Sequence, residues 1–417
     1  MLSRFSGSAA PAGLGRGPRR VRLSPRGSAF LVFAGVALVA AYLAGWPELL
    51  VVACFAAVPP LVALLLVWRQ RAVFSVVRVV SPRVLSARSP GVVRLLVRNA
   101  GAARSARGEW WDRLPWVPGV SEALPLEHVE PDRVRELRYS VVPPARGVVD
   151  VGPFVVRWGD PFALASMECE FGAPERVVVA PELVPLASGV VEIAADSGSA
   201  RLFQHRALAG EHDVMTREYR TGDALRRVHW RSSAHRGELM VREDERRSHA
   251  SAVLLVETRA KRFGDVVGAR SRHPWSELFE WNLSLVVSLR ELLVASGVSV
   301  SVVETSQPQL APARLTHDFV ESLARASPGF DDYRSPRWRD DASRGFGSVF
   351  AVLGVPDSPL VKDLVASRSL FDSAVAFVPR QTPDAVQGSL RTAGWSVVAV
   401  ERGEPVAEAW LRVGADG

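Results

Sequence analysis

The chain has few of the residues on which small secreted or metal-bound domains depend. Its 417 residues include two cysteines, Cys54 and Cys169. Two thiols cannot build a disulfide framework, and their spacing is not that of metal ligands. Lysine is nearly absent, with arginine in its place. These features argue against a disulfide-stapled secreted domain and a zinc ribbon, and the hydrophobic share of 48% argues against a wholly disordered chain.

Acidic residues are missing from the N-terminal 27 positions. Residues 1–27 contain no Asp or Glu and six arginines: Arg4, Arg16, Arg19, Arg20, Arg22 and Arg26. The formal net charge of +7 therefore comes almost entirely from this segment, because 45 basic residues face 44 acidic ones in the rest. A nearly neutral body argues against a nucleic-acid-binding protein. We expect residues 1–27 to form a basic, disordered cytoplasmic tail.

Charge is also missing from two long apolar runs, residues 28–46 and 49–68. Each run is long enough to cross a hydrocarbon core of about 30 Å as a helix. Only Pro47 and Glu48 separate them, so the sequence predicts a transmembrane hairpin over residues 28–69. The alternative is a cleaved signal peptide followed by a buried segment. A signal peptide normally has an apolar region of about 7–15 residues, which is shorter than the first run.

Arginines flank the two runs unevenly. Six precede the first run, Arg69, Arg71 and Arg78 follow the second, and the loop between the runs has no basic residue. The positive-inside rule therefore predicts that both termini and the soluble part of the chain lie in the cytoplasm.

Residues 70–195 have the pattern of a β-rich domain. Valine-rich segments separated by Pro, Gly and Asn predict strands at residues 73–80, 92–98, 137–142, 147–151, 154–157 and 176–179. Their spacing is typical of an antiparallel β-sandwich-like domain. Trp110, Trp111 and Trp116 cluster between strands, and we expect them to pack in a core rather than to form a ligand platform.

Residues 251–417 alternate between strand and helix patterns. The predicted strands are residues 253–256, 298–303, 349–353, 374–378 and 395–400. The predicted helices are residues 275–295, 313–325, 358–366 and 383–392. Apolar strands that alternate with helices indicate an open parallel sheet covered on both faces, as in a Rossmann-like α/β domain.

Residues 196–250 link these two parts and hold the densest charge, at residues 217–247. Asp223 is a predicted N-cap for a short helix that starts at Ala224 and ends near Trp230. Residues 239–242 then predict a strand that enters the α/β domain.

The same segment places acidic residues among arginines. Glu218 and Asp223 lie within reach of several arginines, so charge-assisted pairs are expected. Two interpretations follow. The segment is either an ion-pair clasp between the β-rich and α/β domains, or a surface that binds a partner or ligand.

The segment resembles the signature of the bacterial domain-of-unknown-function family 58, with the pattern R-E-Y-x-x-G-D-x-x-R-x-[IV]-x-W-x-x-[ST]-A-x-x-x-x-L-x-V-[RK]-E. The matching residues are Arg217, Glu218, Tyr219, Gly222, Asp223, Arg226, Val228, Trp230, Ser233, Ala234, Leu239, Val241, Arg242 and Glu243. Arg146-Gly147, residues 159–162 (G-D-P-F) and residues 181–183 (P-E-L) also resemble the family. Ala180 stands where tyrosine is common.

This resemblance implies a multi-pass protein of the bacterial inner membrane with a β-rich domain and a von Willebrand factor A-like α/β domain. Family members often accompany MoxR-type AAA+ ATPases and transglutaminase-like membrane proteins. They resemble adaptors or assembly factors more than enzymes.

A von Willebrand factor A-like domain can hold Mg²⁺ through a D-x-S-x-S motif after its first strand. The corresponding residues here are Glu257-Thr258-Arg259-Ala260-Lys261. Two cationic side chains repel a dication, so this degenerate site at Glu257 and Arg259 predicts no bound metal. The sequence also has no HExxH, GxSxG, Walker A or CxxC motif, and we expect no cofactor and no catalytic residue.

The sequence therefore predicts a membrane-anchored, non-enzymatic scaffold or adaptor that works with a AAA+ ATPase in complex or envelope assembly. The predicted interaction residues are Arg217, Glu218, Tyr219, Gly222, Asp223, Arg226, Trp230, Arg242 and Glu243. One alternative is a ligand-sensing or enzymatic protein that uses this segment to bind an anionic ligand, because arginine clusters suit phosphates and carboxylates. A third hypothesis is recognition of a lipid or cell-wall precursor by the β-rich domain, which follows the membrane hairpin.

Overall fold

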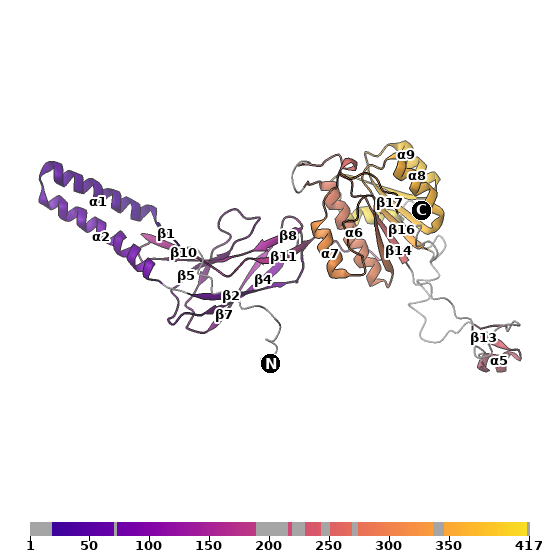
Figure 1. The fold of residues 1–417 in the computed structure, drawn as a ribbon, viewed down its shortest axis with the longest axis horizontal. Helices are drawn as coiled ribbons and strands as arrows, with labels where there is room; N and C mark the ends of the chain where they lie inside the picture. Colours follow the sequence, from indigo (N-terminus) through magenta and orange to yellow (C-terminus); the bar gives the residue numbers. More distant parts are fainter. Residues whose placement is uncertain are drawn as a thin grey trace. The chain divides into compact units, whose positions relative to one another are not determined.

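The computed structural model describes residues 19–70, 73–188, 216–218, 230–242, 251–268, 274–336 and 346–414. The chain divides into two compact units, Met1–Glu182 and Leu183–Gly417 (Figure 1). The finer domain boundaries predicted at residues 70, 196 and 251 remain predictions.

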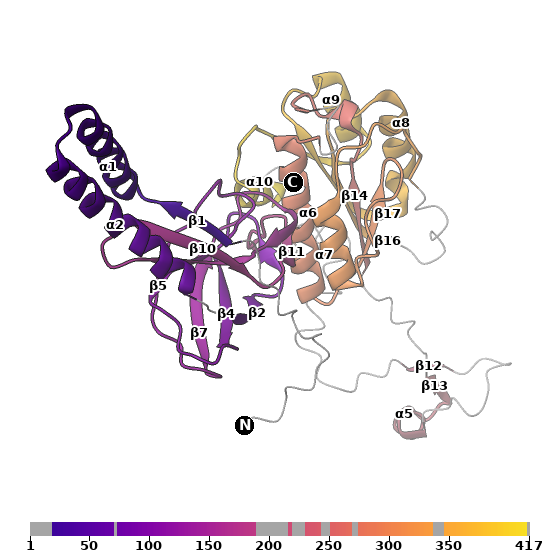
Figure 2. The same cartoon turned by 60° about the vertical axis from the view of Figure 1, so that its left-hand side comes forward.

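The first unit contains two long apolar helices, α1 (Pro25–Ala44) and α2 (Pro47–Arg69), which lie side by side (Figures 1 and 2). The Ser24 hydroxyl caps α1 by accepting the Gly27 N–H at 3.1 Å. Helix α1 ends at Gly45, whose φ of 68° suits glycine. Helix α2 continues through Pro59 and Pro60. Both helices are long and apolar enough to cross a membrane.

A strand precedes the hairpin. Residues Arg19–Leu23 form β1, which pairs antiparallel with β10 (Ala165–Phe171). The prediction of a disordered tail up to residue 27 is therefore wrong for this strand, and residues 1–18 lie outside the described residues. The side chains of β1 are mostly exposed. Backbone hydrogen bonds to the edge of β10 hold it, and such bonds leave no alternating apolar pattern in the sequence.

Three sheets follow, with the strand orders β1-β10-β9-β5-β6, β2-β4-β7 and β3-β11-β8. All pairs are antiparallel except β11 with β3. The strands are β2 (Phe74–Ser81), β3 (Leu85–Ser86), β4 (Gly91–Asn99), β5 (Gly108–Asp112), β6 (Leu124–Leu126), β7 (Val134–Val141), β8 (Gly147–Val151), β9 (Phe154–Gly159) and β11 (Glu175–Ala180). The six predicted strands and the antiparallel architecture are confirmed.

Aromatic side chains fill the core that these sheets share. Trp110 and Trp111 are 2% and 3% exposed, so their predicted core packing is confirmed. Trp110 meets Tyr139 edge-to-face, with ring centroids 5.9 Å apart. Ala63 and Val67, from the last turns of α2, are buried in the same core. The end of α2 is therefore fixed to the sheets by hydrophobic packing.

An ion pair is buried inside this unit. Arg78 donates to Asp112 from Nε to Oδ2 at 3.0 Å and from Nη2 to Oδ1 at 2.8 Å. Tyr139 donates its hydroxyl to Asp112 Oδ2 at 2.8 Å, and burial beside this carboxylate raises the tyrosine pKa. Arg78 was counted among the arginines that orient the hairpin. Its guanidinium is 2% exposed, so it contributes no charge at a membrane surface.

The second unit contains a parallel sheet with the order β15-β14-β16-β17-β18. Its strands are β14 (Ser251–Val256), β15 (Ser299–Glu304), β16 (Phe346–Val352), β17 (Phe371–Pro379) and β18 (Ser396–Val400). Its helices are α6 (Glu277–Ala295), α7 (Thr316–Arg325), α8 (Ser358–Ser367), α9 (Asp384–Thr392) and α10 (Val406–Leu411). One apolar core holds α6, α7 and α10, and a second core holds α8 and α9. The predicted parallel sheet with two covered faces is confirmed.

Candidate functional site

The strand order of the parallel sheet singles out one edge as a candidate site. The chain passes from β14 to β15 on one side and then returns to β16 on the other side of β14. In open α/β sheets, ligands bind at such a reversal, beyond the carboxyl ends of the strands. Glu257 follows β14, Thr305 follows β15, and Asp357 lies between β16 and α8. We call this place the carboxyl edge.

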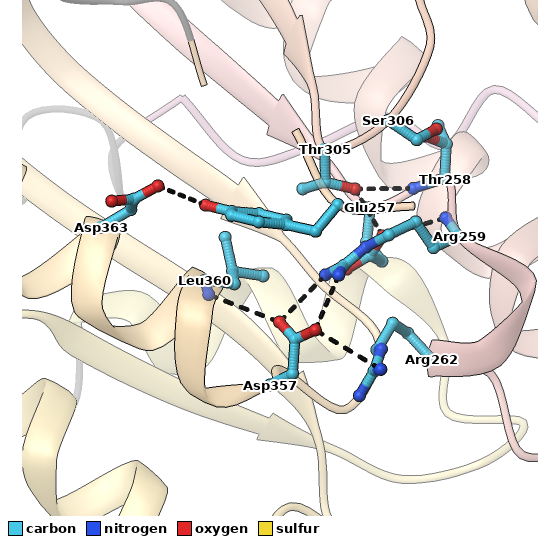
Figure 3. Close-up of polar contacts among 10 residues, drawn as sticks. Glu257, Thr258, Arg259, Arg262, Thr305, Ser306, Asp357, Leu360 and Asp363 are labelled. Carbon is cyan, nitrogen blue, oxygen red and sulfur yellow. Dashed lines mark hydrogen bonds and ion pairs between the residues drawn. The ribbon is translucent and has the colours of Figure 1, made fainter. Parts of the chain in front are cut away.

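The guanidinium of Arg259 lies between two carboxylates at the carboxyl edge (Figure 3). It donates to Glu257 from Nε to Oε1 at 2.9 Å and from Nη2 to Oε2 at 2.7 Å. It also donates from Nη1 to Asp357 Oδ2 at 2.8 Å. The side chains of Glu257 and Arg259 are 0% and 4% exposed. This geometry is that of a buried, charge-assisted network with one cation and two anions.

Other donors also form hydrogen bonds with the Glu257 carboxylate. The backbone N–H of Arg259 donates to Glu257 Oε1 at 2.9 Å, and the Thr305 hydroxyl donates to the same oxygen. The Thr305 hydroxyl also accepts the Thr258 N–H at 3.3 Å. Thr258 and Ser306 share a hydrogen bond between their hydroxyls at 2.7 Å. The polar groups that follow β14 and β15 are thus held by one another.

Asp357 connects this network to α8. Its side chain accepts the Leu360 N–H at the start of the helix, where the helix dipole favours a carboxylate. Arg262 Nη2 lies 3.4 Å from Asp357 Oδ2. Burial by itself raises the pKa of Asp357, but the hydrogen bonds and charge of Arg259 outweigh it and lower the pKa. Burial opposes the charge on Arg259, yet Glu257 and Asp357 raise its pKa.

A segment after α7 crosses the carboxyl edge, and we call residues 328–335 the strap. The Ala260 N–H donates to the Gly329 carbonyl at 2.6 Å, and the Gly329 N–H donates to the Thr258 carbonyl at 2.8 Å. The Tyr333 ring lies under the Arg259 guanidinium, 4.8 Å from its centroid. The Tyr333 hydroxyl donates to Asp363 of α8 at 2.5 Å. Burial, together with this bond and the charge of Asp363, raises the pKa of Tyr333. The strap therefore joins β14 to α8 over the network.

The side chains at the carboxyl edge do not fit a divalent metal. A guanidinium already bridges Glu257 and Asp357, at the place where a dication would have to accept their oxygens. Among the residues that the structure describes, no cluster of three His, Cys, Asp or Glu side chains has a metal-binding arrangement. The chemistry supported here is neutralisation of buried carboxylates by a fixed internal cation.

The predicted interaction residues lie in a small separate motif or outside the described residues. Strand β12 (Thr216–Glu218) pairs antiparallel with β13 (Met240–Arg242), so Arg217 faces Val241 and Arg242 faces Thr216. Tyr219, Gly222, Asp223, Arg226 and Glu243 are outside the described residues, as are the side chains of Arg217, Glu218 and Arg242. The predicted charge-assisted pairs stay predictions.

The predicted helix that ends near Trp230 is wrong at that end, which is the part the structure describes. Helix α5 (Trp230–Arg236) begins at Trp230, where the predicted helix was to end, and residues 224–229 are outside the described residues. The Ser233 hydroxyl accepts the Met240 N–H at 2.8 Å and connects α5 to β13, which explains why the helix runs beyond Trp230. The predicted strand at residues 239–242 is present as β13, which pairs with β12. Trp230 is 69% exposed.

The structure adds residues to the site that sequence reasoning missed. Asp357 lies 98 positions from Arg259, and Tyr333 comes from the strap. A usable signal was present for Asp357 and Thr305, because each follows an apolar strand pattern whose carboxyl end faces the same edge. Tyr333 had no such signal.

Together, the fold and this edge define a class of protein. An apolar helical hairpin and antiparallel sheets precede a parallel α/β sheet whose carboxyl edge is closed by its own ion pairs. Residues 215–288, from β12 into α6, match the family model described as "Protein of unknown function DUF58". The match confirms, over these residues, the resemblance to this family predicted from the motif. No curated protein matches the chain.

Proposed function

We propose that this protein is a non-enzymatic adaptor, anchored by α1 and α2 in the bacterial inner membrane, with its soluble units and both termini in the cytoplasm. One observation carries the proposal. The carboxyl edge, where open α/β sheets bind ligands, is filled by the Arg259 guanidinium, its two carboxylates and the strap. Such an edge stabilises the sheet as a rigid platform for a partner protein.

The hairpin supports the anchor. Most large apolar side chains of α1 and α2 are exposed, which is favourable in lipid and costly in water. The exposed strand β1 brings Arg19, Arg20 and Arg22 next to the start of α1, and Arg69 ends α2. The loop between the helices has no basic residue, so the arginine distribution supports cytoplasmic ends.

The parallel sheet supports a von Willebrand factor A-like platform with a degenerate metal site. Glu257 and Arg259 stand where the family's metal motif would begin, and Asp357 supplies a carboxylate from a second loop. The proposed partner is a MoxR-type AAA+ ATPase, with a transglutaminase-like membrane protein as a further candidate, and both rest on the family resemblance. The exposed Trp230 in the family motif is a suitable partner contact, because tryptophan often anchors interfaces.

Affinity capture of the full chain from detergent-solubilised membranes tests this proposal. We expect a AAA+ ATPase to be enriched with the wild-type chain. A Trp230→Ala variant should reduce the recovery at least tenfold, because truncating an interface hot spot costs about 2 kcal/mol or more. Trp275→Ala is the matched control, since Trp275 is also exposed but lies outside the motif. Equal bait that recovers no AAA+ ATPase would contradict the adaptor function.

A further inference from the structure

A pocket of about 330 Å³ lies in the first unit, at the point where α2 ends. The polar and aromatic side chains that line it come from the end of α2 (Arg69 and Gln70), the β4–β5 loop (Arg104 and Ser105), the β6–β7 loop (His128) and β9 (Trp158). Its volume is at the lower end of the range for small-ligand sites, about 300–1,000 Å³.

Hydrogen bonds and stacking hold the walls of this pocket in place. Trp158 is 1% exposed, stacks on Phe74 and donates its Nε1–H to the Ala106 carbonyl at 3.3 Å. The Ser105 hydroxyl accepts the Val129 N–H at 2.9 Å. His128 Nδ1 lies 2.7 Å from the Ser105 carbonyl, which can only accept, so Nδ1 carries a proton. The pocket is therefore preformed.

Three side chains of the pocket, Arg69, Gln70 and Arg104, have polar atoms without a partner among the described residues. Neither Arg69 nor Arg104 has an ion pair or side-chain hydrogen bond with any residue that the structure describes. The Oε1 atom of Gln70 is buried and has no hydrogen-bond partner among the described residues. Two unpaired cations and an unsatisfied acceptor fit a ligand that carries both an anion and a hydrogen-bond donor.

We propose that this pocket binds the headgroup of an anionic glycerophospholipid of the phosphatidylglycerol type. Arg69 and Arg104 hold the phosphate, and Gln70 accepts a hydrogen bond from a headgroup hydroxyl. The inference rests on the proposed membrane anchor, because Arg69 is the last residue of α2. Its neighbour Trp68 is 59% exposed, and exposed indole rings favour the lipid–water interface. The pocket therefore lies at the depth of lipid phosphates.

The charge of the pocket selects among lipids. Two arginines attract a lipid with net negative charge more than one whose phosphate is balanced by an ammonium group. Phosphatidylglycerol has this net charge and free hydroxyls, whereas phosphatidylcholine has neither. A soluble glycerol phosphate offers the same phosphate chemistry without acyl chains, so the experiment must separate these two sources.

Native mass spectrometry of the full chain, released from detergent micelles with a defined lipid mixture, tests the proposal. The wild-type chain should retain one phosphatidylglycerol in preference to phosphatidylcholine. Arg69→Gln and Arg104→Gln should each weaken retention about fivefold, and the double variant roughly 25-fold, at about 1 kcal/mol for each arginine. Arg83→Gln removes the same charge beyond the opposite end of β2 and should leave retention unchanged.

Three outcomes would overturn the proposal. They are equal retention of phosphatidylglycerol and phosphatidylcholine, equal retention by Arg104→Gln and wild type, and displacement of the lipid by equimolar glycerol phosphate. The last result would assign the pocket to a soluble phosphate. Incorporation into lipid nanodiscs is measured in parallel for each variant. Chains that enter nanodiscs but show no lipid preference contradict only the pocket, whereas chains that fail to enter contradict the anchor itself.

Discussion

Replacement of Arg259 by methionine is expected to destabilise the second unit by about 3–5 kcal/mol, because it leaves a buried carboxylate without its cation. Glu257 is fully buried, and Arg259 supplies two of its hydrogen bonds through the guanidinium. Methionine fills similar space but cannot neutralise the charge. The variant also removes the link between Glu257 and Asp357 that holds the ends of β14 and β16 together.

Hydrogen exchange measured by mass spectrometry reports this effect locally. Amides of β14 should exchange roughly two to four orders of magnitude faster in Arg259→Met, if local opening sets the rate. Arg262→Met is the matched control, because Arg262 also faces Asp357 but is 28% exposed and 3.4 Å away, and it should cost less than about 1 kcal/mol. Adding Glu257→Gln to Arg259→Met should restore part of the protection. Equal exchange in both single variants would contradict a central role for Arg259.

Asp112→Asn should destabilise the first unit by about 3–5 kcal/mol, because Arg78 would become a buried cation without a counter-charge. Both side chains are almost fully inaccessible, at 2% for Arg78 and 0% for Asp112. Asparagine keeps one oxygen that can accept the hydrogen bond from Tyr139. The loss of stability in this variant therefore reports the removed charge and not a change in side-chain shape. The Ala173 carbonyl, which accepts from Arg78 at 2.8 Å, cannot replace a carboxylate.

The same substitution at an exposed pair provides the control. Asp132 pairs with Arg98 on the surface, with side chains 76% and 55% exposed, and Asp132→Asn should change stability by less than about 1 kcal/mol. Asparagine also tolerates the positive φ of 61° at this position. Hydrogen exchange in β2 and β5 compares the two variants. Similar protection in both would show that the buried Arg78–Asp112 pair does not determine the stability of these strands.

Local patterns were sufficient to predict most of the fold. The valine-rich runs of β4 and β8 and the apolar runs of β14 and β17 were all recognised, because burial dictates their composition. Strand β10 was missed although its alternate residues are buried, since Ser and Glu between them lower its apolar content. Strand β1 was missed because its pairing depends on backbone atoms and its side chains face solvent.

The site was harder to predict than the fold, because its contacts are long-range. Glu257 and Arg259 were identified from one motif. The ion-pair network that they form also needs Asp357, which the parallel register of β14 and β16 brings close to them. The strap adds Tyr333 from a segment with no regular structure. The role of Arg78 was predicted wrongly for the same reason. Its position after the second apolar run suggests a charge at the membrane surface, but its partner Asp112, 34 residues away, holds it inside the first unit.

The most direct test of an edge closed by its own guanidinium is the effect of excess Mg²⁺ or Mn²⁺ on hydrogen exchange in β14 of the wild-type chain. The closed edge predicts unchanged protection, because Arg259 already neutralises Glu257 and Asp357. Asp384→Asn, at the exposed start of α9, controls for non-specific ion binding. Metal-dependent protection that Asp357→Asn abolishes and Asp384→Asn retains would show that the carboxyl edge binds a dication, and would contradict the closed platform.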